Sequence, residues 1–329
     1  MYIYMNKNDI YEIAKKIEKN GGRLYLVGGA VRDSLLKING HDEDYCVVGI
    51  ESSTFEEMFK NAVKRGKDFE VFDLDGREFA MARLERKVAK GHKGFEIISG
   101  KNVTLLEDLK RRDITINSIA QDVLTKEIID PFNGRKDLEK GIIRATSKSF
   151  IEDPLRVYRV ARFASKLQFK VEKNTIEVMK NLKNELNSLS KERVFQELRK
   201  ALNQDKPSIF FNVLKEAGVL DVHFEEIYKL IGAEQPVKYH PEGDAYNHTM
   251  LALDMSAKLT NDEKIRFSVL VHDLGKGLTK KEEYPHHIGH EEKGVEQLEK
   301  FSKRLKIPNS WKKCGKTACR EHMKRWDFL

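Results

Sequence analysis

The chain has 329 residues, of which 40% are hydrophobic and 34% charged, a balance typical of a folded protein with two or three domains. No apolar run approaches the roughly 18–20 residues of a membrane-spanning helix, and the acidic, interrupted N-terminus does not resemble a signal peptide. The three cysteines are scattered and odd in number, which indicates free thiols and predicts a cytoplasmic protein.

The net charge of +8 is concentrated at the C-terminal end. Residues 300–329 hold ten Lys or Arg against two acidic residues, so the remainder of the chain is neutral overall. A basic segment of this kind can attract the phosphate backbone of a nucleic acid. A solvated helix face is the simpler interpretation of a charge run, so the composition permits an RNA partner without establishing one.

The first half of the chain alternates helical and β-rich segments. Apolar residues at helical spacing predict a helix over 9–19, which ends at two glycines. This alternation predicts an α/β domain over residues 1–148. Its remaining predicted elements are a helix over 30–37 and strands over 24–27, 44–48, 70–72, 78–84 and 127–129.

From residue 150 onward, apolar residues recur at helical spacing, which predicts an all-α second half. Pro207 and the segment 235–241, with its two prolines, are plausible breaks between helical subdomains. We therefore predict a helical neck over 149–234 and a further helical domain over 235–329.

Paired glycines stand between the strand predicted at 24–27 and the helix that follows. At Gly28 and Gly29 the backbone can approach a phosphate closely, and the N–H groups of the helix can donate to it. Arg32, on the first turn of that helix, can donate two parallel hydrogen bonds from its guanidinium to a phosphate. Taken alone, a plain strand–helix turn explains the glycines equally well.

Asp42 and Asp44 enter the next predicted strand two residues apart, so both side chains leave the same face. Two neighbouring carboxylates suit Mg²⁺, which takes substrate phosphates and water as its other ligands. Two such ions can activate a hydroxyl and stabilise a leaving pyrophosphate. A phosphate-binding turn followed by this pair predicts nucleotidyl transfer more strongly than either feature alone.

The segments LYLVGGAVRD and HDEDYCVVG resemble the nucleotidyltransferase motif of class II tRNA nucleotidyltransferases and bacterial poly(A) polymerases, in the DNA polymerase β-like superfamily. The resemblance implies that Asp42 and Asp44 bind metal, and that Gly29 and Arg32 contact the nucleotide. Residues 108–117 resemble the RRDxTIN motif of the family, which implies a nucleotide contact for Arg112. Without the resemblance, a solvated basic turn would explain that segment.

The resemblance also implies an activity and partners. Enzymes of this family add C, C and A to the 3′ end of tRNA from CTP and ATP, with Mg²⁺, in tRNA maturation and repair. A loop between the two head motifs favours addition of all three nucleotides, and residues 73–94 form a long segment there. A poly(A) polymerase and a CC-adding relative share the same motifs and remain alternatives.

The segment 152–163 predicts a helix whose start carries Asp153 and Arg156. A carboxylate accepts from the exocyclic amine of C or A, and a guanidinium donates to ring nitrogens or a carbonyl. In the resembled family this segment is the protein template for the incoming base, which implies that role for Asp153 and Arg156. Arg159 and Arg162 drift around the helix, so we expect them to reach phosphate or RNA. The alternative interpretation is a solvent-exposed Asp–Arg ion pair on the helix surface that takes no part in base recognition.

Seven of the ten histidines lie within residues 240–322. His248 followed by the dipeptide His272-Asp273 resembles the HD phosphohydrolase family, and such ligands suit a transition metal, for example Ni²⁺. The resemblance implies phosphatase and 2′,3′-cyclic phosphodiesterase activity on damaged tRNA ends. His286, His287 and His290 extend the histidine-rich pattern.

HD sites normally close with a further Asp on a later helix. After His322 the sequence offers only Asp327, near the end of the chain, so we expect this domain to be shortened and its site incomplete. A metal phosphohydrolase without transferase activity and a non-catalytic tRNA-binding fragment are the alternatives from other functional classes.

Overall fold

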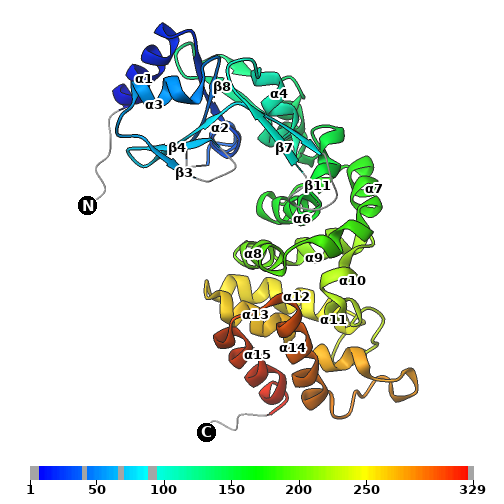
Figure 1. Cartoon of the computed structure of the whole chain (residues 1–329). Helices are drawn as coiled ribbons and strands as arrows, with labels where there is room; N and C mark the ends of the chain where they lie inside the picture. Colours follow the sequence, from blue (N-terminus) through cyan, green and yellow to red (C-terminus); the bar gives the residue numbers. More distant parts are fainter. Residues whose placement is uncertain (1–6, 39–42, 66–69, 88–94, 325–329) are drawn as a thin grey trace. The chain divides into compact units, whose positions relative to one another are not determined.

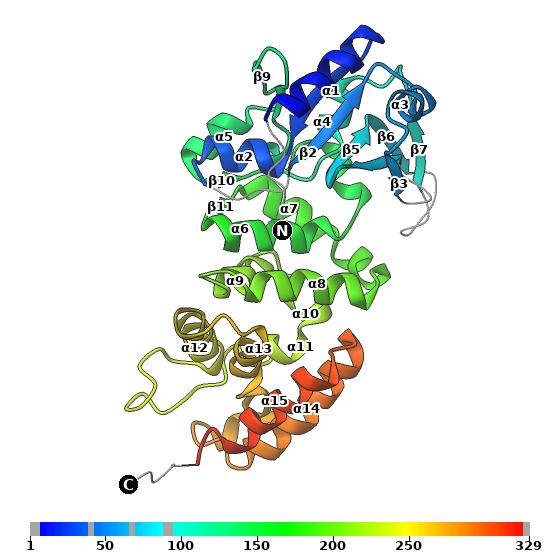
Figure 2. The ribbon, with the colours of Figure 1, turned by 90° about the vertical axis from the view of Figure 1, so that its left-hand side faces the viewer.

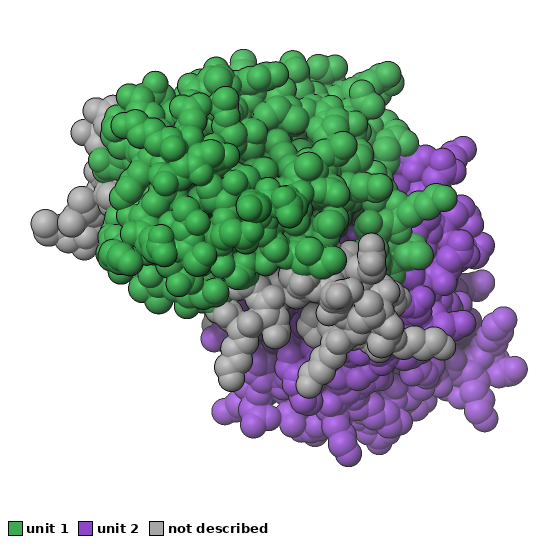
Figure 3. Space-filling model, turned by 45° about the horizontal axis from the view of Figure 1, so that its top comes forward, with its two compact units in different colours: residues 1–153 green, residues 154–329 purple. Residues whose placement is uncertain are grey.

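The computed structural model describes residues 7–38, 43–65, 70–87 and 95–324. The chain divides into two compact units, 1–153 and 154–329 (Figures 1 and 3). The first is the predicted α/β domain, and it extends five residues beyond the predicted boundary. The second contains both predicted helical domains. None of the described helices is long and apolar enough to cross a membrane.

A seven-stranded sheet organises the first unit. The strand order is β3-β4-β5-β2-β1-β8-β9, and the pairing is antiparallel except between β2 and β5. The predicted strands at 24–27 and 44–48 are β1 and β2, which pair directly. The strands are β1 (Arg23–Val27), β2 (Asp44–Val48), β3 (Val63–Arg65), β4 (Val71–Leu74), β5 (Arg77–Met81), β8 (Ala120–Asp122) and β9 (Ile128–Ile129).

The two faces of the sheet have different cores. Helices α1 (Lys7–Lys19) and α3 (Ser52–Met58) supply Ile17 and Phe55 to a cluster that also contains Tyr45 and Val47 from β2. Cys46, between them in the strand, points to the opposite face and packs with Leu109, as the two-residue period of a strand requires. This second face carries α4 (Leu105–Lys110) and the hairpin of β6 (Arg83–Lys87) with β7 (Phe95–Ser99).

The remaining elements of the first unit are short. Helix α2 (Gly29–Leu35) follows β1, and α5 (Gly134–Lys140) packs on the 3-10 turn Thr115–Asn117, before the two-residue strand β10 (Ile142–Ile143). The strand predicted over 78–84 is divided between β5 and β6, so the prediction of one continuous strand was wrong. Residues 88–94 of the expected loop lie outside the described residues.

Apart from the two-residue strand β11 (Lys170–Val171), the second unit is helical, as predicted (Figure 2). The apolar stripe of α6 is fully buried at Val157, Val160, Ala161 and Ala164. Helix α6 packs on α8 and α9, and α15 packs on α13 and α14. The helices are α6 (Arg156–Leu167), α7 (Lys173–Asn181), α8 (Lys191–Leu202), α9 (Ser208–Glu216), α10 (Leu220–His223), α11 (Glu225–Tyr228), α12 (Ala245–Leu259), α13 (Glu263–Val271), α14 (His290–Leu305) and α15 (Asn309–Glu321).

One buried polar pair lies inside this helical core. The Tyr158 hydroxyl and Nδ1 of His223 are 2.6 Å apart, and both residues are fully buried. Burial, together with the nearby charges of Lys191 and Arg304, lowers the pKa of His223 to about 4. His223 is therefore neutral in the folded protein at neutral pH, because charging it would place a cation in the core beside other cations.

This depressed pKa predicts a pH-dependent stability. An unfolded histidine protonates below about pH 6.5, whereas His223 in the folded chain resists protonation until about pH 4. Between these values the unfolded state binds more protons, so the stabilisation is complete above pH 6.5 and is lost as the pH falls toward 4. Relative to His223→Gln, the wild type should lose up to about 3 kcal/mol of unfolding free energy over this interval. Urea unfolding at several pH values measures the difference, and parallel curves for the two proteins would contradict it.

Candidate functional site

The turn after β1 adopts a conformation that requires glycine. Gly28 has φ 68° and ψ −127°, and its N–H donates to the carbonyl of Ile119. A Cβ atom at this position would lie 2.9 Å from Nη1 of Arg112. Gly28 therefore serves two purposes, since it permits the left-handed backbone and leaves space for a guanidinium beside the turn. Gly29 then opens α2.

The carboxylate strand begins next to this turn. In the β1–β2 pair, Asp44 lies opposite Val27, the residue immediately before Gly28, and its side chain is exposed. Asp42 lies outside the described residues. On the other side of β2, Asp44 pairs in parallel register with Glu78 of β5, which is also exposed. Register partners project from the same face of a sheet, so Glu78 is a further carboxylate beside Asp44 that the sequence alone did not indicate.

Asp108 fixes the arginines of the second motif. Its side chain is 1% exposed and accepts from Nη2 of Arg111 at 2.5 Å and from Nη2 of Arg112 at 3.0 Å. Burial alone would raise the pKa of Asp108, but the two guanidinium groups hold it at about 2. The carboxylate is therefore charged at any physiological pH, and it positions Arg112 against the Gly28 turn.

Arg32 connects the two head motifs. It is 3% exposed, and its guanidinium donates to Asp33 and to the side-chain oxygen of Asn117, both at 2.5 Å. Asn117 in turn donates to Asp113. The segments around residues 28–33 and 112–117 are thus joined by buried charged hydrogen bonds. Arg32 holds this framework together, and its expected contact with a nucleotide stays a prediction.

The arginines of α6 differ in their surroundings. Arg156 is buried at the start of the helix, and Arg159 lies half-buried with its guanidinium 5.6 Å from the Phe163 ring. Arg162 donates to Glu197 of α8 at 2.6 Å and lies 4.1 Å from the same ring. This pair compensates the charge of Arg162 within the helical unit, and its expected contact with phosphate or RNA stays a prediction. Asp153, which ends the first unit, stays a predicted base contact.

The second unit gathers histidines around one buried carboxylate, that of Asp273. Nε2 of His272 lies 3.2 Å and Nε2 of His248 4.0 Å from its Oδ2 atom. Nε2 of His322 and of His290 lie 3.2 and 3.6 Å from Oδ1. These side chains come from α12, the end of α13, the start of α14 and the end of α15. The sequence predicted His272 and His248 as ligands and placed His290 in the same histidine-rich pattern, but it gave His322 no role.

The hydrogen bonds of these imidazoles set their orientation. Nδ1 of His272, His290 and His322 each lies 2.7–2.9 Å from a backbone carbonyl oxygen, and Nδ1 of His248 lies 2.6 Å from a carboxylate oxygen of Glu242. In a neutral imidazole the nitrogen that faces an acceptor carries the proton. The other nitrogen, Nε2, faces the Asp273 carboxylate, so it can donate a proton to that carboxylate or, where a metal ion takes the place of the proton, bind the ion through its lone pair.

A buried carboxylate among imidazoles is stabilised either by protons on the nitrogens that face it or by a metal ion bound between them. Oδ1 of Asp273 is buried, and Nε2 of His322 lies 3.2 Å from it. Burial alone would raise the pKa of Asp273, but His272, His322 and Lys276 hold it well below its usual range. A histidine that binds a transition metal through one ring nitrogen usually donates its other ring N–H to an acceptor, as these four rings do. The donor set therefore fits such an ion.

Two of the expected residues lie apart from this cluster. His287 directs Nε2 to the carbonyl of Glu234, and His286 is exposed. Asp327, the only aspartate that the sequence offers after His322, lies outside the described residues. The structure thus brings His290 and His322 to Asp273 from the later helices, where the sequence interpretation sought an aspartate.

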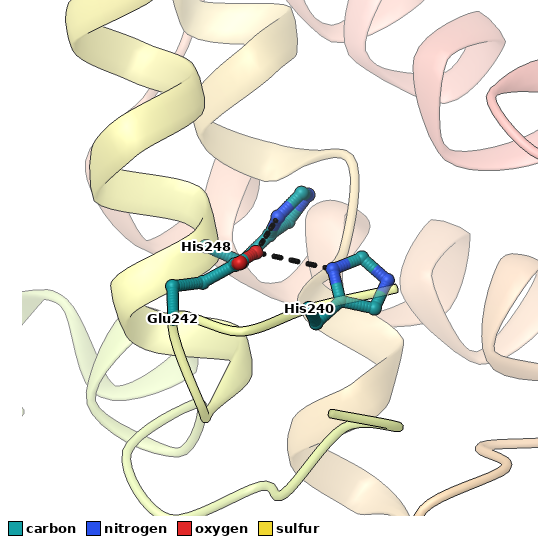
Figure 4. A group of neighbouring side chains, drawn as sticks. All are labelled: His240, Glu242 and His248. Carbon is teal, nitrogen blue, oxygen red and sulfur yellow. Dashed lines mark hydrogen bonds and ion pairs between the residues drawn. The ribbon is translucent and has the colours of Figure 1, made fainter. Parts of the chain in front are cut away.

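Glu242 and His240 lie on the Nδ1 side of the His248 ring. Figure 4 shows Glu242 between His240 and His248, and one carboxylate oxygen accepts from Nδ1 of both, at 3.1 and 2.6 Å. A carboxylate behind a ligand histidine fixes its ring and its tautomer. His240 falls in the segment 235–241, which was interpreted from sequence as a break between subdomains, and Glu242 directly follows that segment, so their role was missed.

Comparison with known proteins assigns each part of the chain. Residues 24–144 match the poly A polymerase head domain, residues 168–231 the probable RNA and SrmB-binding site of polymerase A, and residues 239–328 the HD domain. The multifunctional CCA proteins of Shewanella denitrificans and Psychromonas ingrahamii are each 46% identical, over 91% and 90% of this chain and 74% and 73% of theirs.

Solved structures agree in fold. A CCA-adding enzyme in its apo form II has a TM-score of 0.67 at 24% identity, covering 95% of this chain and 79% of that one. A tRNA-processing enzyme with CTP has a TM-score of 0.58 at 25% identity, covering 92% and 76%.

These findings define a nucleotidyltransferase head joined to helical RNA-binding and HD domains. The chain belongs to the family of multifunctional CCA proteins. It spans about three quarters of the length of these relatives.

The Asp108 ion pairs predict a large loss of stability on truncation. Asp108→Ala leaves two mostly buried guanidinium groups without their carboxylate, which should lower the unfolding free energy by about 3 kcal/mol. Urea unfolding measures this loss. Glu139→Ala, which removes an exposed carboxylate in the same unit, should change stability by less than about 0.5 kcal/mol. Equal effects of the two substitutions would show that the pairs contribute nothing.

Proposed function

We propose that this chain adds C, C and A in turn to the 3′ end of tRNA, from CTP and ATP with release of pyrophosphate, in tRNA maturation and repair. The observation that carries the proposal is the register of β1 and β2, which sets Asp44 beside the Gly28 turn and Arg112. The 46% identity to proteins named for CCA addition supports it. This substrate makes the cytoplasm the expected location.

In nucleotidyl transfer, different residues of the head would bind the metal ion and the triphosphate. Asp42 and Asp44 would hold Mg²⁺, which when bound lowers the pKa of the tRNA 3′-hydroxyl and neutralises the leaving pyrophosphate. Gly28 and Gly29 present backbone N–H groups to the triphosphate, and Arg112 adds a guanidinium beside them. Positioning of the two substrates then supplies much of the rate.

Base selection falls to Asp153 and Arg156. C and A both carry an exocyclic amine that a carboxylate accepts, whereas U and G present a carbonyl oxygen there that a carboxylate repels. The chain therefore needs no template strand to accept CTP and ATP. A poly(A) polymerase would ignore CTP and extend with A alone, and a CC-adding relative would stop after two nucleotides.

The direct test is extension of tRNA that lacks its CCA end, followed on a sequencing gel with Mg²⁺, CTP and ATP. The wild type should add three nucleotides, and Asp42→Ala or Asp44→Ala should lower the rate by on the order of 10³-fold, since each removes a metal ligand. Glu57→Ala, an exposed carboxylate on α3, should retain full activity. A long A tail or a stop after CC would replace the proposed activity by one of its relatives.

The Gly28 turn gives a second prediction. Gly28→Ala and Gly76→Ala both place a Cβ on a residue with positive φ, but Gly76 faces open space whereas Gly28 faces Arg112. Both substitutions strain the backbone because both residues have a positive φ, and Gly28→Ala alone also crowds the guanidinium of Arg112. Gly28→Ala should raise the KM for CTP and ATP about tenfold or more, and Gly76→Ala should leave it unchanged. Equal KM values would remove Arg112 and the turn from nucleotide binding.

We also propose a metal-dependent phosphohydrolase activity for the HD domain, directed at phosphates or 2′,3′-cyclic phosphates on damaged tRNA ends. The convergence of His248 and His272 on Asp273 supports it. A transition metal such as Ni²⁺ bound there would supply an activated water for hydrolysis.

Removal and return of metal tests this second activity. Chelation should abolish hydrolysis of 2′,3′-cyclic AMP, and added Ni²⁺ should restore it, because the bound ion would supply the activated water. His272→Ala should abolish hydrolysis while leaving CCA addition in Mg²⁺ intact. Hydrolysis that persists in His272→Ala would assign the activity to another site.

A further inference from the structure

A closed loop of the second unit leads into α12 beside the histidine cluster. The loop covers residues 235–243. Its ends are joined, because the N–H of Gln235 donates to the carbonyl of Gly243 at 3.1 Å. Between them, the N–H of Tyr239 donates to the carbonyl of Pro236 at 2.9 Å. These hydrogen bonds give the loop an ordered backbone around Tyr239.

Side chains tie both ends of this loop to the histidine cluster. At its start, Oε1 of Gln235 accepts from Nζ of Lys276 at 2.6 Å, and Lys276 also donates to Asp273 at 2.7 Å. Near its end, a carboxylate oxygen of Glu242 lies 2.6 Å from Nδ1 of His248 (Figure 4). The middle of the loop is therefore held at a fixed position relative to the cluster.

The middle of the loop exposes an aromatic ring. Tyr239 is 70% exposed, whereas Gln235 at the start of the same loop is 3% exposed. An aromatic side chain stabilises a core through the area that it buries, so the Tyr239 ring contributes little to the fold. The ammonium of Lys238 lies 5.2 Å from the centroid of this ring, which places a positive charge next to it.

The exposed ring lies within a nucleotide's reach of the cluster. Tyr239 directly precedes His240, and consecutive Cα atoms are 3.8 Å apart. The ring centroid of His240 is 4.7 Å from that of His248, which in turn is 5.4 Å from that of His272. An RNA end whose last phosphate enters the cluster can therefore bring its last base to Tyr239.

We propose that Tyr239, with Lys238 beside it, is a stacking platform for the base of the 3′-terminal nucleotide of an RNA whose phosphate enters the HD site. The proposal rests on the phosphohydrolase function proposed above, and it names the part of the substrate that this domain recognises. An aromatic ring stacks on every base without reading its sequence. Such a platform suits damaged tRNA ends, which differ in their last base.

An apolar contact with another protein is the competing use of this surface, since Val237 on the same loop is also exposed. The ammonium of Lys238 favours RNA, because it attracts the phosphate backbone. The two uses also need different side chains at residue 239. A protein contact would depend on apolar area, whereas a base needs a flat ring on which to stack.

The fluorescence of 2-aminopurine, which falls when this base stacks, tests the platform directly. A short single-stranded RNA that ends in a 2-aminopurine nucleotide with a 3′-phosphate is mixed with the full chain and followed by stopped flow, before turnover. The wild type should quench the fluorescence. Tyr239→Ala should weaken this binding about 5- to 150-fold, the loss expected for one base–aromatic stack. The same RNA with 2-aminopurine far from its 3′ end should be quenched much less, and equal quenching would overturn the terminal placement.

Matched variants separate stacking from apolar contact and from the fold. Tyr239→Trp keeps an aromatic ring and should retain the quench, whereas Tyr239→Leu keeps apolar bulk without a ring and should lose it. Tyr228→Ala removes another exposed tyrosine of the same unit and should behave as the wild type. Because Tyr239 is mostly exposed, its variants should fold, which circular dichroism checks. Wild-type affinity and quenching in Tyr239→Ala or Tyr239→Leu would overturn the platform.

Hydrolysis provides a separate readout. Tyr239→Ala should raise the KM for 2′,3′-cyclic AMP by a similar factor and leave kcat nearly unchanged, because the ring binds the base and does not touch the reacting phosphate. A fall in kcat with an unchanged KM would contradict base binding by Tyr239. A quench that depends on Tyr239 in a chain that hydrolyses nothing would support the platform and count against the proposed phosphohydrolase activity alone.

Discussion

The pairing of β1 with β2 is the constraint on which the head depends. A backbone ladder with Val27 opposite Asp44 sets the first residue of the carboxylate strand next to the last residue before the phosphate turn. The strand register alone brings Asp44 next to the turn, so this arrangement does not depend on a long side chain. Ile17 and Phe55 hold the sheet from one face and Leu109 from the other. The cores therefore fix the register, and the register fixes the site.

Much of this was predictable from local pattern. Strand 44–48, the helix after Gly29 and the buried stripe of α6 follow from periodicity, which acts over a few residues. What the sequence could not provide is pairing between distant segments. Glu78 becomes a neighbour of Asp44 only through the parallel register of β2 and β5. A continuous strand was expected over 78–84, but the chain divides it between the sheet and a separate hairpin.

The same inability to predict pairing between distant segments explains why the sequence did not predict the partner of Arg162 in α6. It also explains why the sequence did not predict all the histidines around Asp273. Helical geometry showed that Arg162 turns away from Arg156, but not that Glu197 of α8 would meet it. His290 and His322 are 32 residues apart, and only the packing of α14 on α15 brings their Nε2 atoms within 3.1 Å. Motifs indicated the chemistry of these regions, whereas long-range packing selected the residues that carry it.

Two buried aspartates show how opposite surroundings produce opposite functions. Asp108 and Asp273 are each 1% exposed, and both have their pKa held low. The partners of Asp108 are guanidinium groups, which are permanent donors, so the carboxylate is satisfied and acts as a support for Arg112. The partners of Asp273 are the ammonium of Lys276 and imidazoles, which exchange a proton for a metal ion. Burial therefore makes Asp108 a permanent structural support, whereas Asp273 stands among groups that can also act as metal ligands.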